Sequence, residues 1–210
     1  MTATASAETP NLSRLRGFIA DFTRLVERQG GDEPALLDAG RLLLAGLIAE
    51  DDWLPDAYAE PDPERYRQYL LHCDPHERFS VVSFVWGPGQ RTPIHDHTVW
   101  GLVGVLRGAE RSQRYDLQPD GGPPVAHPPD ILAAGSVEAV SPRIGDVHAI
   151  ANALPDRPSI SIHVYGGNIG AIRRSVFDPL TGQPKPFISG YANTALPNLW
   201  DRSHAASQAA

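Results

Sequence analysis

Apolar residues at three- and four-residue intervals dominate the first quarter of the chain and predict two amphipathic helices. The apolar face of the first helix comprises Leu12, Leu15, Phe18, Ile19, Phe22, Leu25 and Val26. Gly30-Gly31 ends this run, and Asp32-Glu33-Pro34 supplies an N-cap, an acidic first turn and an early proline for a second helix that continues to about Ile48. The second helix is apolar over much of its circumference, so we expect it to pack against a larger unit.

From Tyr66 onward the pattern changes to short β-rich runs separated by turn clusters, with no helical spacing between them. The runs cover residues 69–71, 79–86, 99–106, 111–117, 131–133, 137–140, 148–150 and 159–165. Many short strands at close spacing are typical of a β-sandwich or β-barrel. We expect a single domain with a disordered tail (1–10), helices packed on a barrel (11–65), the barrel itself (66–180) and a C-terminal tail that wraps the surface (181–210).

Composition narrows the classes of partner. The 210 residues suit one sizeable domain, and contents of 41% hydrophobic and 20% charged residues are those of a globular protein. A net charge of -7 argues against nucleic acid, and no apolar run approaches the length of a membrane span. The N-terminus lacks the basic and apolar regions of a signal peptide, and the single cysteine, Cys73, excludes an internal disulfide. These features favour a cytoplasmic protein, either a monomer or a small homo-oligomer.

Two histidines one residue apart, His95 and His97, follow a Pro/Gly turn. Side chains alternate between the two faces of a strand, so both histidines point to one side and Asp96 points to the other. Neutral imidazole is the commonest nitrogen ligand for borderline metals. The pair is therefore the beginning of a candidate metal site.

Two separately spaced blocks resemble the two motifs of the cupin superfamily. Residues 89–108 read Gly, five residues, His95-x-His97, three residues, Gly101, six residues, Gly; residues 142–152 read Pro-x-x-Gly-x-x-His148-x-x-x-Asn. The resemblance implies a mainly β fold, a double-stranded β-helix or small β-barrel, here with an N-terminal helical segment. It also implies a metal held by the three histidines. The first motif usually carries a Glu ligand where this chain has Gly101, which leaves roughly half of an octahedron free for substrate and dioxygen.

Within the cupins, residues 66–177 resemble the thiol dioxygenases of the cysteine dioxygenase family. Trp86-Gly87-Pro88-Gly89 and His95-Asp96-His97-Thr98 are similar to that family's approach to its iron. Ser161, His163 and Tyr165 match its hydrogen-bonded Ser-His-Tyr relay. The resemblance implies that Tyr165, oriented by His163 and Ser161, contacts the substrate.

The alternation of residues 159–165 supports the relay independently. Ser, Ser, His and Tyr fall on one face of this strand, and Ile, Ile and Val fall on the other. A polar row inside a barrel is costly unless its members hydrogen-bond to one another. Without the resemblance, the pattern favours a polar face turned to solvent, with the aliphatic face lining the barrel.

Two departures from the family pattern concern the cross-link to the active-site tyrosine and the residue that binds the substrate carboxylate. Mammalian-type members carry a cysteine just after the HxH segment that is cross-linked to the active-site tyrosine, whereas this chain reads Trp100-Gly101-Leu102 and its only thiol is Cys73. We therefore expect no cross-link. Those members also hold the substrate carboxylate with an Arg on an earlier strand, where Gln68 stands here, although Arg67 is adjacent and a one-residue slip would exchange the two.

A Gln at that position resembles the bacterial branch that prefers 3-mercaptopropionate, in which a later Arg binds the carboxylate. Arg174 is the candidate for this role and Arg173 is the alternative. A guanidinium can hold a carboxylate through two parallel hydrogen bonds.

The resemblance implies an oxidoreductase in which Fe(II), held by His95, His97 and His148, binds a small thiol as its thiolate and O2 supplies both oxygen atoms of a sulfinic acid product. 3-Mercaptopropionate is the favoured substrate. Three alternatives remain open: L-cysteine or cysteamine as the preferred thiol, a non-catalytic cupin that binds a metal or ligand, and a cupin that uses Zn or Ni in hydrolysis or isomerisation.

Overall fold

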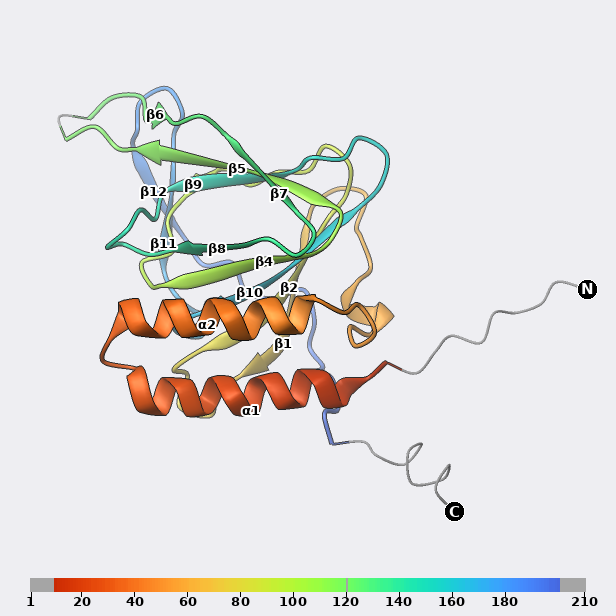
Figure 1. The fold of residues 1–210 in the computed structure, drawn as a ribbon. Helices are drawn as coiled ribbons and strands as arrows, with labels where there is room; N and C mark the ends of the chain where they lie inside the picture. Colours follow the sequence, from red (N-terminus) through yellow and green to blue (C-terminus); the bar gives the residue numbers. More distant parts are fainter. Residues whose placement is uncertain (1–9, 120, 201–210) are drawn as a thin grey trace, which may run out of the picture.

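Two helices precede the sheets in the computed structural model, which describes residues 10–119 and 121–200 (Figure 1). Helix α1 spans Leu12–Gln29 and α2 spans Glu33–Ile48, as the apolar spacing predicts. The side chain of Asp32 caps α2 by accepting a hydrogen bond from the backbone N–H of Ala35 at 3.2 Å. A 3-10 turn, η1 (Asp56–Tyr58), lies in the connector to the first strand. Of the expected N-terminal tail, residues 1–9 lie outside the described chain.

Antiparallel pairing joins five strands into a first sheet, in the order β1-β2-β10-β4-β8. These strands are β1 (Arg67–Cys73), β2 (Ser80–Trp86), β4 (Gly101–Arg107), β8 (Val137–Val140) and β10 (Ser159–Tyr165). Every residue of β2 and of β10 is buried, so these two strands are covered on both faces. Strand β10 is the middle strand of this sheet and pairs with β2 on one side and β4 on the other.

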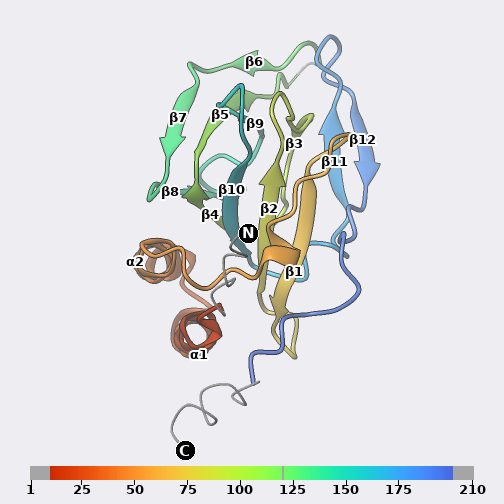
Figure 2. The same ribbon diagram turned by 90° about the vertical axis from the view of Figure 1, so that its right-hand side faces the viewer.

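The second sheet faces the first and has the order β12-β11-β3-β9-β5-β6, with β7 paired to β5 (Figures 1 and 2). Its strands are β3 (Ile94–His95), β5 (Ala109–Asp116), β6 (Val125–Ala126), β7 (Asp130–Ala133), β9 (His148–Asn152), β11 (Arg174–Phe177) and β12 (Pro184–Phe187). The result is a mainly β cupin fold with an N-terminal helical segment, as expected from the sequence.

Strand β12 lies within the segment that the sequence pattern assigns to a wrapping tail. Pro184 and Pro186 disrupt the strand pattern, because proline cannot donate to a β-ladder. Both are accommodated because β12 is the last strand of its sheet and pairs only with β11. Of the tail, residues 201–210 lie outside the described chain.

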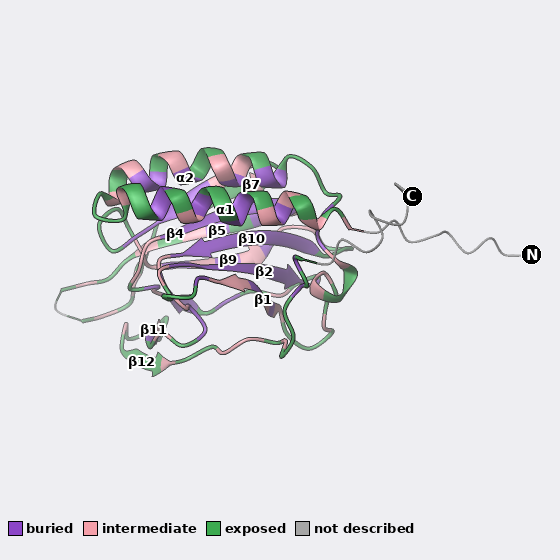
Figure 3. Cartoon of the chain, turned by 90° about the horizontal axis from the view of Figure 1, so that it is seen from below, coloured by how far each residue is buried: buried purple, intermediate pink, exposed green. Residues whose placement is uncertain are grey.

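The helices cover the outer face of the first sheet and thereby decide which side of β10 points inward (Figures 2 and 3). Ile160, Ile162 and Val164 belong to the apolar core that includes the buried faces of α1 and α2. The alternate residues of β10 therefore point between the two sheets, and the polar row does not face solvent. Within the described residues, neither helix combines the length and the apolar character needed to cross a bilayer.

Candidate active site

Three histidines converge between the two sheets. His95 ends β3 and His148 begins β9, and these two residues are direct cross-strand partners. His97 follows two residues after His95, and the three ring centroids are 4.8, 4.9 and 4.8 Å apart. One ring nitrogen from each histidine lies within 4.8 Å of the other two, and all three side chains are buried. This is a compact set of three nitrogen donors.

The state of each ring fits metal binding. Nδ1 of His95 is 3.1 Å from the carbonyl of Pro93 and Nδ1 of His97 is 2.9 Å from Oδ1 of Asp146, so that Nε2 of both rings is free to act as a ligand. Burial lowers the pKa of His95 to about 3, with a further contribution from His97, and burial lowers the pKa of His148 well below its usual value. Neutral imidazoles with free lone pairs are what a transition metal requires.

Asp146 completes this arrangement and was not predicted from the sequence. Its carboxylate accepts hydrogen bonds from Nδ1 of His97 and from the backbone N–H groups of His97 and Thr98, each at 2.9 Å. Burial opposes its ionisation, but the interactions with His97 and Thr98 together outweigh burial and lower the pKa of Asp146. Its place two residues before His148, inside the second motif, was the available signal, because metal-binding histidines usually donate to a carboxylate or carbonyl.

The polar row of β10 forms a continuous hydrogen-bonded chain. Oγ of Ser161 lies 2.8 Å from Nε2 of His163, and Nδ1 of His163 lies 2.8 Å from the hydroxyl of Tyr165. Burial lowers the pKa of His163 and raises the pKa of Tyr165, so both groups stay neutral at pH 7. The ring of Tyr165 is stacked on His97 with centroids 5.3 Å apart. The chain therefore ends beside the three histidines.

A cavity of about 190 Å³ opens beside the histidines and the relay. It is lined by Tyr66, Gln68, Phe84, Trp86, Thr92, Pro93, His95, His148, Ile150, His163, Tyr165, Arg174, Val176, Phe187 and Ser189. The lining is mostly apolar and aromatic, which is typical of a small-molecule site. Among the described residues of this lining, Arg174 is the only arginine, lysine, aspartate or glutamate.

Arg174 is 4% exposed and has no carboxylate partner among the described residues. Its Nη2 donates to Oγ of Ser189 at 2.7 Å, its guanidinium lies 4.6 Å from the ring centroid of Phe187, and its Nε has no hydrogen-bond partner. Burial lowers its pKa, although the guanidinium remains charged. A buried cation without a counter-ion favours an anionic ligand.

Of the other residues that the sequence suggests for substrate binding, one lies at the cavity and two lie away from it. Gln68 lines the cavity and donates to Oγ of Ser189 at 3.2 Å and to the carbonyl of Gly190 at 3.0 Å. Arg67 points away and forms an ion pair with Asp62. Arg173 is exposed and does not line the cavity, unlike Arg174.

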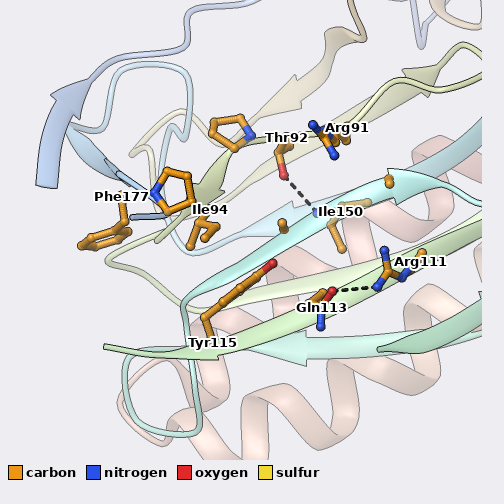
Figure 4. Close-up of a pocket in the computed structure, with 12 residues that line it drawn as sticks. Arg91, Thr92, Ile94, Arg111, Gln113, Tyr115, Ile150 and Phe177 are labelled. Atoms are coloured by element: carbon orange, nitrogen blue, oxygen red, sulfur yellow. Dashed lines mark hydrogen bonds between the residues drawn. The ribbon is translucent and has the colours of Figure 1, made fainter. Parts of the chain in front are cut away.

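A second cavity, of about 300 Å³, shares Thr92, Pro93 and Ile150 with the first in its lining (Figure 4). Its lining includes Arg91, Arg111, Gln113, Tyr115 and Phe177, with Arg111 donating to Gln113 at 2.8 Å. None of the three histidines lines it. The chemistry of the histidines therefore belongs to the smaller cavity.

A model of the family described as Cysteine dioxygenase type I matches residues 45–176. The chain belongs to the cysteine dioxygenase type I family. It is accordingly a thiol dioxygenase, an oxidoreductase that uses a thiol and O2, and a member of a metalloenzyme family. Its three-histidine cluster could hold the metal.

Individual relatives are distant in sequence. The chain is 26% identical over 168 residues to "Cysteine dioxygenase type 1" of Rattus norvegicus, a match that covers 78% of this chain and 80% of the rat protein. It is 24% identical over 155 residues to the protein of the same name from Danio rerio, covering 72% and 70% of the two chains. A solved protein with a double-stranded β-helix domain from Klebsiella pneumoniae is 22% identical, with a TM-score of 0.45 over 58% of this chain and 95% of that one.

Gly101 stands against the active-site tyrosine. A Cβ atom built on Gly101 would lie 2.9 Å from Cδ1 and 3.0 Å from Cε1 of Tyr165, and 3.0 Å from Cγ2 of Val140. This position has neither the thiol nor the carboxylate that the family resemblance and the first cupin motif place just after the HxH segment. Cys73, the sole thiol, is on β1, and both Cys73 and Tyr165 pair with Ser80 from opposite sides of β2. Tyr165 therefore has β2 between it and the thiol.

We predict that Gly101→Ala destabilises the protein by about 1–3 kcal/mol, because the added methyl group overpacks against Tyr165 and Val140. Urea denaturation measures this effect. Gly46→Ala in α2 is the matched control, since a Cβ there meets nothing within 4 Å and should add helix propensity, about 1 kcal/mol of stability. Equal effects of the two substitutions would show that Gly101 is not constrained by Tyr165.

We predict that Asp146→Asn weakens metal binding by about 10- to 100-fold, because an amide cannot accept all three hydrogen bonds that tie His97 and Thr98 to Asp146. Competition with a coloured chelator measures the affinity. Asp96→Asn is the control: Oδ1 of Asp96 accepts one hydrogen bond, from the N–H of Ser175 at 2.7 Å, and an amide oxygen can keep it. An unchanged metal affinity in Asp146→Asn would show that Asp146 does not support metal binding.

Proposed function

We propose that this protein is an Fe(II)-dependent dioxygenase that oxidises a small mercapto-carboxylate, 3-mercaptopropionate above all, to its sulfinic acid. One observation carries the choice of substrate. The cavity beside the histidines contains the buried, unpaired cation of Arg174, and no aspartate or glutamate is among the described residues that line it. A mercapto-carboxylate complements this charge, whereas the ammonium group of cysteine or cysteamine finds no anion there.

The three imidazoles of His95, His97 and His148 would hold the Fe(II), leaving positions open beside the cavity. Fe(II) bound there would supply the sites at which thiolate and O2 meet. Iron is preferred over zinc because the reaction of the family is an oxidation by O2, for which zinc offers no redox chemistry.

In this proposal Arg174 binds the substrate carboxylate through two hydrogen bonds. Val176, two residues later on the same face of β11, is the cross-strand partner of His95. The backbone of Arg174 is therefore displaced from that of His95 by about 7 Å in the direction of the strands. This offset directs the thiol end of a short acid toward the histidines. Ser189 holds Nη2 of Arg174 and also accepts from Gln68, which limits the side-chain freedom of both residues.

Tyr165, which also lines the cavity, would act as a second polar contact for the substrate. His163 and Ser161 fix the direction of its hydroxyl through hydrogen bonds of 2.8 Å. The three side chains are buried, which protects the hydrogen bonds between them from bulk water. We thus propose that the relay of Ser161, His163 and Tyr165 holds a proton beside the bound substrate.

L-Cysteine is the second candidate substrate, since the matched family and the rat and zebrafish relatives carry the name cysteine dioxygenase. Cysteamine ranks below both acids because it lacks the carboxylate that Arg174 would bind. We further propose a cytoplasmic monomer or small homo-oligomer that binds neither nucleic acid nor membranes, in line with the net charge of -7 and the single cysteine.

The test is kcat/KM for 3-mercaptopropionate, L-cysteine and cysteamine, in the wild type and in Gln68→Arg. We expect the wild type to rank the substrates in that order, and we expect Gln68→Arg to raise the ratio of cysteine to 3-mercaptopropionate turnover. Arg67→Gln, on the outward-facing neighbour, should leave the ratio unchanged. A wild type that prefers cysteine would replace the first candidate by the second.

A further inference from the structure

A buried carboxyl group adjoins the far end of the relay. Glu110 lies on β5, is 0% exposed, and neither carboxyl oxygen has a hydrogen-bond partner of normal geometry among the described residues. Ser161, Ser159 and Trp86 nevertheless lie close enough to Glu110 for hydrogen bonding to offset part of the effect of burial on its pKa. Oγ of Ser159 is also buried without a partner. Neither the metal site nor the substrate cavity described above uses Glu110.

The environment keeps this carboxyl protonated at neutral pH. Burial raises the pKa of Glu110 to about 8, and the two hydroxyls and the indole offset burial only in part. No arginine, lysine or histidine forms an ion pair with Glu110 in the described chain. Well below pH 8 Glu110 is thus mainly a carboxylic acid that can donate one hydrogen bond.

A hydrogen-bonded chain of neutral groups can run in only two directions. His163 is neutral and carries one N–H, and Nε2 and Nδ1 are both engaged, with Ser161 and Tyr165 respectively. If Ser161 donates to Nε2, the N–H is on Nδ1 and donates to Tyr165, whose own O–H is then free for the cavity. If instead Nε2–H donates to Ser161, Nδ1 accepts the proton of Tyr165, and the cavity receives a lone pair.

We propose that Glu110 is a positioning residue that sets the direction of the Ser161–His163–Tyr165 chain. Protonated Glu110 donates to Oγ of Ser161, so the serine hydroxyl donates to His163 and Tyr165 presents its O–H to the substrate cavity. Ionised Glu110 accepts the serine hydroxyl and reverses every bond of the chain. The indole Nε1–H of Trp86, 3.3 Å from Oγ of Ser161, donates in both states.

The use of Tyr165 in this inference rests on the proposed function, whereas the direction of the chain is a property of the protein alone. The other ionisable groups on β5 and on the elements packed against it are Arg111, Arg114, Tyr115 and Asp116 on β5 itself, His163 and Tyr165 on β10, His148 on β9, Asp130 on β7 and Glu138 on β8. Of these, Glu138 is occupied by Arg114 at 2.9 Å and Ser112 at 2.8 Å.

The test is ¹⁵N NMR of histidine-labelled, metal-free protein between pH 6.5 and 9.5, with His163→Asn used to assign the ring signals. We expect His163 to carry its proton on Nδ1 at pH 6.5 and on Nε2 at pH 9.5, with a midpoint near pH 8. Glu110→Gln stays neutral and keeps a donor for Ser161, so His163 should keep Nδ1–H throughout. Glu138→Gln, which alters another buried carboxylate, should leave the change in place.

A wild-type His163 with the same tautomer across the whole range would overturn the proposal, and this holds even if Glu110→Gln does not fold. A tautomer change that survives in Glu110→Gln, or that disappears in Glu138→Gln as well, would also overturn it. Because the measurement needs neither thiol, O2 nor metal, it separates this inference from the proposed function: a protein without oxygen uptake can still show the predicted change.

Discussion

His148→Ala should abolish stoichiometric metal binding and reduce oxygen uptake by more than about 100-fold, beyond the usual cost of losing a group that only orients a ligand. The histidine rings are spaced almost equally, at 4.8 to 4.9 Å, and the substitution removes one of three donors in this buried set. Two imidazoles from β3 and the following turn would remain, with no third donor opposite them on β9. Metal content and oxygen consumption with 3-mercaptopropionate measure the effect.

His72→Ala is the matched control for this experiment. His72 lies on β1 and packs on Phe79, with ring centroids 5.7 Å apart, and it does not line the cavity. Its removal should leave metal content and oxygen uptake within about twofold of the wild type. If His148→Ala retained full metal content while folded, the three-histidine site would be wrong.

Arg174→Leu should lower kcat/KM for 3-mercaptopropionate by at least roughly 30-fold, which corresponds to about 2 kcal/mol, the lower end of the cost of breaking a buried charged pair. The guanidinium is 4% exposed and is held by Ser189 and Phe187, so it is already oriented before a carboxylate arrives. Oxidation of 2-mercaptoethanol, which has no carboxylate, should not fall. The effect is thus a change in specificity and not a general loss of activity.

Arg173→Leu separates this role from a general effect of charge. The two arginines are adjacent, but Arg173 is exposed and Arg174 is buried in the cavity wall. Arg173→Leu should change kcat/KM for both thiols by less than about twofold. Equal losses for the two variants, or an equal loss of both substrates in Arg174→Leu, would mean that Arg174 does not bind the carboxylate.

The parts of the fold that the sequence predicts correctly follow from local physics. The apolar spacing of residues 12–48 and the cap at Asp32 define both helices to within a few residues. The alternation of residues 159–165 defines β10 completely. What alternation cannot decide is which face is covered, because that depends on α1 and α2, which pack on the aliphatic side. The family resemblance provided that choice.

Other features depend on partners distant in the chain. Strand β12 forms at a sheet edge that only the folded protein has, despite its prolines. The register of β1 turns Gln68 inward and Arg67 outward, a choice that the sequence left open. The partners of Asp146 and the isolation of Glu110 come from loops and strands that meet only in the barrel. Motif spacing predicted candidate ligands, whereas the groups that orient them required the structure.

Isotope incorporation tests the central claim most directly. The Fe(II)-loaded protein would be given 3-mercaptopropionate under ¹⁸O2, and mass spectrometry would measure the mass of the sulfinate product. A thiol dioxygenase places two ¹⁸O atoms in each sulfinate, one O2 consumed for each product molecule, and His148→Ala forms none. Oxygen consumption that yields only disulfide, or a sulfinate that carries one or no ¹⁸O, would contradict the account.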